Sequence, residues 1–275
     1  MTTPSPYEQL KNDLGYLQLG RATECFATVA DRAKEENWSH VEYLAAVMAE
    51  QVAATTNRRL AARLRYARFP YVRSVADFDF SFQPSVDRKL VEDLASLRFI
   101  EENRPIVFLG QPGCGKTHLA VALATKAVEA GYRGYFSTAD AMVRTLLQAR
   151  REGNFATKLR GFTAPSVLVV DDVGLLPIDT EGAGVFFHVV NARYENGHPT
   201  LVTTNRVCPP GATCSVTRWW PVPSSTGSCT KRWYSTSKGP RGACVSTPPW
   251  PRHPRHDRHL DPRPRPRRDR AQWLA

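Results

Sequence analysis

Residues 106–130 read IVFLGQPGCGKTHLAVALATKAVEA, and this stretch decides the fold. It opens with four apolar residues, a run typical of a buried strand, and ends in a segment with helical periodicity. Between them, residues 110–117 match the spacing G-x-x-x-x-G-K-[ST]. Glycines let successive backbone N–H groups turn toward an anion, and a helix N-terminus adds unpaired donors and partial positive charge. The stretch therefore predicts a phosphate-binding loop.

The loop contains candidate ligands for a nucleoside triphosphate and its metal ion. We expect the Lys116 ammonium to reach the β- and γ-phosphates and the Thr117 hydroxyl to ligate Mg²⁺. ATP and Mg²⁺ are therefore the predicted cofactors. The candidate nucleotide-binding residues are Gly110, Gln111, Pro112, Gly113, Cys114, Gly115, Lys116, Thr117 and His118.

Two further apolar runs end in polar side chains that belong to the same candidate site. Residues 167–170 lead into Asp171 and Asp172, and residues 200–203 lead toward Asn205. Ligands bind beyond the carboxyl ends of the strands in open α/β sheets. We expect Asp171 to hold Mg²⁺, usually through water, and Asp172 to orient and deprotonate the attacking water. Lys116 and Asn205 complete the predicted catalytic set, although an Asp-Asp turn and a strand-terminating Asn are the ordinary alternatives.

The spacing of apolar residues predicts an α/β fold. We expect strands at 106–109, 134–137, 167–170 and 200–203, and helices at 86–101, 116–130, 139–150 and 182–195. Short apolar strands that alternate with helices are typical of a parallel sheet covered on both faces. Residues 6–68 have helical periodicity throughout and end in an arginine-rich segment: Arg58, Arg59, Arg63, Arg65 and Arg68. That segment is either a solvated helix face or a surface that binds nucleic-acid phosphates.

The chain divides into four predicted parts. Residues 1–68 form a helical N-terminal domain that contacts DNA or a partner, and residues 69–104 are a linker and a helix leading into the core. Residues 105–206 form the ATP-binding core, and residues 207–275 form a basic tail. The tail holds 13 Lys and Arg against 3 Asp, and 12 of the 21 prolines. The chain carries a net charge of +11, so its basicity comes almost entirely from the tail.

Three motifs resemble one known family: GQPGCGKTHLA, then VLVVDDVGLLP, then NARYENGHPTLVTTNR. They are similar to the IstB-type helper ATPases of bacterial insertion sequences, which resemble the DnaC helicase loaders within the AAA+ class. The resemblance covers about residues 5–206 and implies an AAA+-like P-loop NTPase fold. It implies an ATPase that assembles as a homo-oligomer on double-stranded DNA and regulates the transposase of the same insertion sequence. A helicase loader is the alternative that the resemblance leaves open.

The resemblance stops at Arg206. The family continues with a helical segment and two functional arginines, whereas this tail contains no Ile, Phe, Met, Glu or Asn. Permissible codons for the tail, read one base earlier, can encode an amphipathic helix, an apolar strand and a closing basic segment like those of the family. We therefore expect a frameshift near Arg206 and a mostly disordered tail. The rival interpretation is a genuine basic arm that binds phosphates by charge.

The sequence also indicates where the protein acts. No apolar run approaches the roughly 20 residues that span a bilayer, and the first residues do not have the pattern of a signal peptide. We expect a cytoplasmic protein without a membrane partner. A third functional hypothesis follows from the tail: a non-catalytic, frameshifted remnant that binds nucleotide without turnover.

Overall fold

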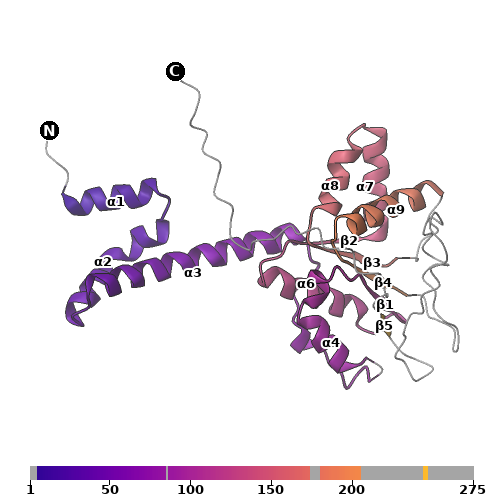
Figure 1. Cartoon of the computed structure of the whole chain (residues 1–275), viewed down its shortest axis with the longest axis horizontal. Helices are drawn as coiled ribbons and strands as arrows, with labels where there is room; N and C mark the ends of the chain where they lie inside the picture. The colour runs from indigo at the N-terminus through magenta and orange to yellow at the C-terminus, as the bar shows by residue number, and fades with distance from the viewer. Residues whose placement is uncertain (1–4, 85, 174–179, 206–243, 247–275) are drawn as a thin grey trace.

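The computed structural model describes residues 5–84, 86–173, 180–205 and 244–246. Helices and strands alternate through its central part, after three helices at the start of the chain (Figure 1). The elements are, in chain order, α1 (Pro6–Tyr16), α2 (Gly20–Glu35), α3 (His40–Ala67), η1 (Val75–Asp77), α4 (Arg88–Ala95), α5 (Arg98–Glu101), β1 (Ile106–Leu109), α6 (Lys116–Glu129), β2 (Gly134–Thr138), α7 (Ala139–Arg151), α8 (Phe155–Thr163), β3 (Val167–Asp171), α9 (Thr180–Glu195), β4 (Thr200–Thr204) and β5 (Cys244–Ser246).

The strands form one sheet in the order β2-β3-β4-β1-β5. The first four are parallel, and β5 pairs antiparallel with β1. Ile106 pairs with Leu201 and Leu168 pairs with Thr200, which brings the carboxyl ends of β1, β3 and β4 to one edge. The predicted parallel sheet is confirmed, and this edge is where the phosphate loop, the two carboxylates and Asn205 meet.

Alternate residues of the strands supply two cores, one on each face of the sheet. Val167 and Val169 face α6 together with Leu119 and Leu123, and all four are fully buried or nearly so. Leu168 and Val170 face the opposite way, toward α7, α8 and α9. Figure 1 shows these helices on one side of the sheet and α4 and α6 on the other. Strands buried on both faces explain why the runs in the sequence are continuously apolar.

The three N-terminal helices have a small core of their own. Ala22, Phe26 and Val47 are its buried residues. Capping boxes begin α1 at Ser5 and α3 at Ser39, where each serine hydroxyl accepts from the backbone N–H three residues on. The predicted helical region of residues 6–68 is therefore three helices separated by short turns.

The end of α3 covers the edge strand β2. The Tyr66 and Tyr135 rings lie 5.7 Å apart, and the Arg68 guanidinium lies 5.7 Å from the Tyr135 ring. A β-carbon added at Gly134 would lie 3.1 Å from the Phe69 ring, so the chain after α3 packs directly against the start of β2. An uncovered edge strand offers unpaired backbone groups to other chains, and α3 shields this one.

Several elements differ from the predictions. The helix expected at 86–101 is divided into α4 and α5, because Leu97 adopts a left-handed conformation with φ 65°. Helix α8 and the short turn η1 have no counterpart among the expected elements. In the tail, the structure describes only Cys244–Ser246, which form β5, so the expectation of disorder concerns residues outside the described part.

Candidate nucleotide-binding site

The loop between β1 and α6 has the backbone shape that its glycines predict. Gly113 and Gly115 adopt φ values of 83° and 77°, a region that residues with a side chain rarely enter. A β-carbon at Gly115 would also lie 2.5 Å from the Phe78 ring. Both positions therefore require glycine, and the loop leads directly into the N-terminus of α6. Gln111, Pro112 and Gly113 are exposed, and Gly110 is buried.

Lys116 begins α6 and points back across the loop. Its ammonium donates to the Gln111 carbonyl at 2.7 Å, and the residue is only 6% exposed. Burial lowers the pKa of Lys116, while the charges of Asp172 and Asp171 act in the opposite direction. A buried ammonium held by one carbonyl inside a loop of amide donors is poised to exchange that carbonyl for a phosphate oxygen.

Thr117 connects the loop to the carboxylate strand. Its hydroxyl donates to Asp171 Oδ1 at 2.9 Å, across 54 residues of sequence. The same carboxylate oxygen accepts the hydroxyl of Thr203 from the neighbouring strand β4. Asp171 is 7% exposed, and two hydroxyl groups donate to its carboxylate. The predicted metal-binding pair, Thr117 and Asp171, is therefore in contact.

Asp172 follows in a strained turn beside Asn205. Its φ is 58°, and its backbone N–H donates to the Thr203 hydroxyl at 3.0 Å. The Asn205 amide donates to Asp172 Oδ1 at 3.3 Å. Burial raises the pKa of Asp172, and the negative charge of Asp171 raises it further. A carboxylate with a raised pKa next to a phosphate loop has the properties of a general base.

An aromatic segment upstream packs over the start of α6. The Phe78 ring contacts the Phe80 ring edge-on at 4.9 Å and the His118 ring at 5.6 Å. His118 Nε2 lies 3.4 Å from the Ser74 carbonyl. The structure thus places His118 against residues 74–78 in the first turn of α6, directly after Lys116 and Thr117, while residues 110–115 lie in the loop itself.

Two residues near the carboxylates escaped prediction. Thr203 lies inside an apolar run, where threonine is an ordinary strand residue, and only its register with β3 reveals its partners. Burial raises the pKa of Tyr71, and the charge of Asp171 adds to the shift, so this phenol lies near the site. The pairing of Arg73 with the Tyr71 ring, at 5.9 Å, also could not be inferred from spacing.

Arg193, in the last turn of α9, is not a surface residue. It is fully buried, and its guanidinium donates to the Thr200 hydroxyl and to the carbonyls of Phe162, Pro165, Ser166 and Pro199. Burial lowers its pKa to about 9, so the group stays charged at neutral pH. It ties the start of β4 to the loop before β3, and all five of its side-chain N–H groups donate within the chain.

The oxygen pair of Thr117 and Asp171 fits a magnesium ion. Mg²⁺ prefers oxygen ligands in octahedral geometry at about 2.0–2.1 Å, which sets neighbouring ligand oxygens about 2.9 Å apart. The two side-chain oxygens are 2.9 Å apart. Within residues 5–84, 86–173 and 180–205 there is no group of three His, Cys, Asp or Glu side chains that could hold a metal alone.

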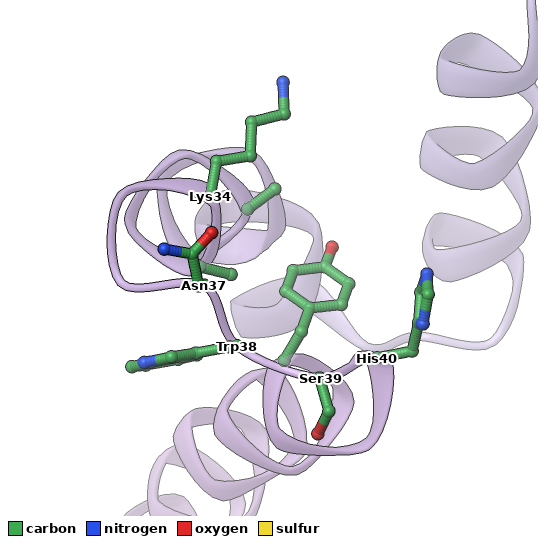
Figure 2. A pocket seen from close by; sticks show the side chains of 8 residues that line it. Lys34, Asn37, Trp38, Ser39 and His40 are labelled. Atoms are coloured by element: carbon green, nitrogen blue, oxygen red, sulfur yellow. The ribbon is translucent and has the colours of Figure 1, made fainter.

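A separate hollow lies at the turn between α2 and α3 (Figure 2). Its polar groups already serve the turn: Ser39 caps α3, the Tyr43 hydroxyl donates to the Phe26 carbonyl at 3.2 Å, and the Trp38 indole donates to Glu36 at 2.9 Å. We assign it no ligand. The lining residues are Ala30, Ala33, Lys34, Asn37, Trp38, Ser39, His40 and Tyr43.

A parallel sheet with a phosphate loop after β1 and paired carboxylates after β3 defines the class of P-loop NTPases, in an AAA+-like arrangement. The family model described as IstB-like ATP binding protein matches residues 12–209. The chain belongs to this family. The match ends three residues after Arg206, where the sequence resemblance was also expected to stop.

Relatives encoded by insertion sequences support the assignment. The chain is 37% identical over 179 residues to the "Insertion sequence IS21 putative ATP-binding protein" of Pseudomonas aeruginosa, covering 65% of this chain and 67% of the relative. It is 36% identical over 190 residues to the IS5376 protein of Geobacillus stearothermophilus, covering 69% and 75%. It is 34% identical over 199 residues to the IS232 protein of Bacillus thuringiensis subsp. berliner, covering 72% and 79%.

Solved structures with similar folds come from replication proteins. The DnaC helicase loader aligns with a TM-score of 0.43 and 28% identity, over 56% of this chain and 84% of that chain. AMPPCP-bound DnaA from Aquifex aeolicus aligns with a TM-score of 0.42 and 23% identity, over 48% and 42%. Among the described residues, no helix combines the length and the apolar composition that a membrane span needs.

Proposed function

We propose that this protein binds Mg-ATP in the loop of residues 110–118 and hydrolyses it. The observation that carries the proposal is the set of hydrogen bonds that joins Thr117, which follows Lys116 in the sequence, to the two carboxylate residues. Thr117 and Thr203 both donate to Asp171, and Asp172 lies in the adjoining turn. The loop and the carboxylates come from separate strands, so their meeting at one point reflects a single site. Membership of an ATP-binding family supports ATP as the nucleotide.

The residues divide the work of binding. Backbone N–H groups of residues 110–115 and the N-terminus of α6 surround the phosphates, and Lys116 compensates their charge. Thr117 and Asp171 would hold Mg²⁺, which when bound neutralises charge on the β- and γ-phosphate oxygens. Cys114 contributes its backbone rather than its thiol, so the cysteine at this position leaves binding intact.

Hydrolysis assigns a role to Asp172. A water molecule attacks the γ-phosphorus, the bond to the β–γ bridging oxygen breaks, and Asp172 takes the proton of the water. The raised pKa of this carboxylate makes it a better proton acceptor than an ordinary aspartate. Asn205, which donates to Asp172 at 3.3 Å, fixes the orientation of that carboxylate toward the γ-phosphate.

The wider role that we propose is that of a helper in DNA transposition. The three relatives named above are ATP-binding proteins of insertion sequences, and this context supports a switch that assembles on double-stranded DNA and regulates the transposase of its own element. The second half of α3 supports the DNA contact, because Arg58, Arg59 and Arg65 are exposed there and no acidic residue occurs from 51 to 76. We infer a homo-oligomer on DNA in the cytoplasm.

A pull-down separates this role from helicase loading. The tagged protein, loaded with Mg-ATP and duplex DNA, should retain the transposase of the same insertion sequence and not the replicative helicase. Retention of the helicase alone would favour the loader.

A second candidate, the non-catalytic remnant, rests on the burial of Arg193, which removes one of the few arginines available for catalysis near β4. Mg-ATP binding without turnover would support it.

The nucleotide site itself is tested by Lys116→Ala. We expect tight Mg-ATP binding to be lost, because the variant deletes the charge that compensates the β- and γ-phosphates. Titration with a fluorescent ATP analogue measures the affinity. Cys114→Thr is the matched control in the same loop and should bind as the parent chain does. Unchanged binding by Lys116→Ala would remove the proposal.

A further inference from the structure

Thr203 lies between the two carboxylate residues and bonds to both. It is fully buried in β4. Its hydroxyl accepts the Asp172 backbone N–H at 3.0 Å and donates to Asp171 Oδ1. A hydroxyl carries a single hydrogen. Because the backbone N–H must be the donor in the first bond, that hydrogen is directed to the carboxylate, and the direction of both bonds is determined.

These two hydrogen bonds fix the positions of the Asp171 carboxylate and of the Asp172 backbone. Asp171 Oδ1 is held between the hydroxyls of Thr117 and Thr203, so its position depends on both strands and on the loop. The Asp172 turn has φ 58°, a conformation that costs energy for a residue other than glycine, and the Thr203 hydroxyl is the acceptor for its N–H. The Thr203 carbonyl also accepts the Val173 N–H at 2.9 Å, which extends the same support.

Another buried threonine of β4 shows that this arrangement is not a general property of the strand. The Thr200 hydroxyl accepts from the Arg193 guanidinium at 2.9 Å, on the opposite end of the strand. Valine would fill the space of Thr203 equally well, but it could neither hold Asp171 nor accept from Asp172. The hydroxyl therefore serves the carboxylates rather than the packing of the sheet.

We propose that Thr203 is a positioning residue that sets Asp171 for the metal of Mg-ATP and holds the Asp172 turn. The inference rests on the proposed ATP site and adds a residue to it. It predicts that the benefit of Mg²⁺ for ATP binding depends on the Thr203 hydroxyl, while contacts of the loop and Lys116 with the phosphates do not.

Three variants of the full chain test this. The affinity for a fluorescent ATP analogue is measured in Mg²⁺ and in excess EDTA, and the ratio gives the strengthening by Mg²⁺. Thr203→Val should lower this ratio about tenfold, the usual effect of losing a hydrogen bond to a charged group, and leave affinity in EDTA within about twofold. Thr203→Ser keeps the hydroxyl and should retain the ratio. Thr125→Val is the control, because it removes a buried hydroxyl for which the described residues offer no partner.

The outcomes are distinct. An unchanged Mg²⁺ ratio in Thr203→Val overturns the inference, as does an equal loss in Thr125→Val or a loss of affinity in EDTA as large as in Mg²⁺. The parent chain tests the proposed function separately. If it binds no ATP, the proposed function fails, and the inference fails with it. Circular dichroism checks folding, and Thr203→Ala, which also lacks the hydroxyl, gives the same readout if the valine variant does not fold.

Discussion

Arg193 illustrates how a charged side chain can be entirely structural. Its guanidinium is surrounded by four carbonyls and one hydroxyl, and its described surroundings contain no carboxylate partner. A buried charge costs free energy unless its hydrogen bonds are satisfied, and here all the donors have oxygen partners. The role of such a residue lies in joining three segments: the loop before β3, the end of α8 and the start of β4.

Replacing Arg193 with methionine should lower the free energy of unfolding by about 3 kcal/mol or more, because several buried carbonyls lose their donor. Urea unfolding followed by circular dichroism measures the change. Arg160→Met, at an exposed arginine of α8, is the control and should change stability by less than about 0.5 kcal/mol. A small effect at Arg193 would mean that water replaces the guanidinium without cost.

Asp172→Asn should separate binding from hydrolysis. The amide keeps an oxygen that accepts from Asn205, so Mg-ATP affinity should stay within about threefold, whereas loss of the general base should slow hydrolysis by about 10²-fold or more. Single-turnover assays with labelled ATP measure the rate. Burial raises the pKa of Asp172. Protonation of this carboxylate removes the proton acceptor, so the parent rate should fall as pH decreases. An acid limb that persists in Asp172→Asn would assign the proton acceptor elsewhere.

At the scale of elements, α3 connects the candidate DNA surface to the sheet. Its first half packs on α2, and its end covers β2 through Tyr66 and Arg68. The chain then reverses at Arg68, whose φ is 56°, and runs past Phe69 and Tyr71 toward the carboxylates. Residues 68–71 follow α3 directly, and Tyr71 lies near Asp171. A movement of α3 on DNA would therefore be passed to residues beside the nucleotide site.

The arginines of α3 should control DNA affinity. Replacing Arg58, Arg59 and Arg65 together with glutamine should weaken duplex binding for all sequences and reduce the salt slope by about 2 to 3, near 0.9 for each lost phosphate contact. Fluorescence anisotropy over a range of NaCl concentrations measures both. Replacing Arg98, Lys158 and Arg160, which are exposed on α5 and α8, removes the same charge elsewhere and serves as the control.

A chain ending at Arg206 tests the tail: if it loses the affinity and the slope while the α3 variant keeps them, the contact lies in residues 207–275.

The elements show which features the sequence could predict. Apolar runs predicted β1 at its observed bounds and β3 and β4 to within one residue, because a strand buried on both faces has no polar interruption. The loop and Asp171 followed from spacing. Thr203 and Tyr71 did not, because their positions depend on strand register and on how residues 69–80 pack beside the site. The division of α4 from α5 depends on one left-handed residue, Leu97, which no pattern marks.

At the scale of the whole molecule, charge and family likeness change at the same place. Residues 1–206 contain 24 Lys and Arg against 23 Asp and Glu, whereas the remainder is strongly basic. The family match ends at residue 209. A single change in reading frame accounts for both, since composition and resemblance would be lost together. The gene sequence tests this: restoring one base near the Arg206 codon should open a frame that encodes the family's C-terminal region, and its absence would leave the basic arm as the explanation.

The rate of ATP hydrolysis should also depend on the loss of the family's sequence after Arg206. Hydrolysis needs a positioned water, a metal and positive charge on the transition state, and an arginine from a neighbouring subunit typically contributes about 10³–10⁵ in rate. In residues 180–205 the sole arginine is Arg193, which is buried and bonded within its own subunit. We therefore expect this chain to bind Mg-ATP but to hydrolyse it slowly, with little stimulation by DNA or by raising the protein concentration.

A frame-restored chain should be faster by at least about tenfold, a small part of what such an arginine can contribute. Phosphate release, measured for both chains over a range of protein concentrations, decides the matter. Robust, concentration-dependent hydrolysis by the chain as it stands would mean that Arg206 or the tail supplies the missing charge.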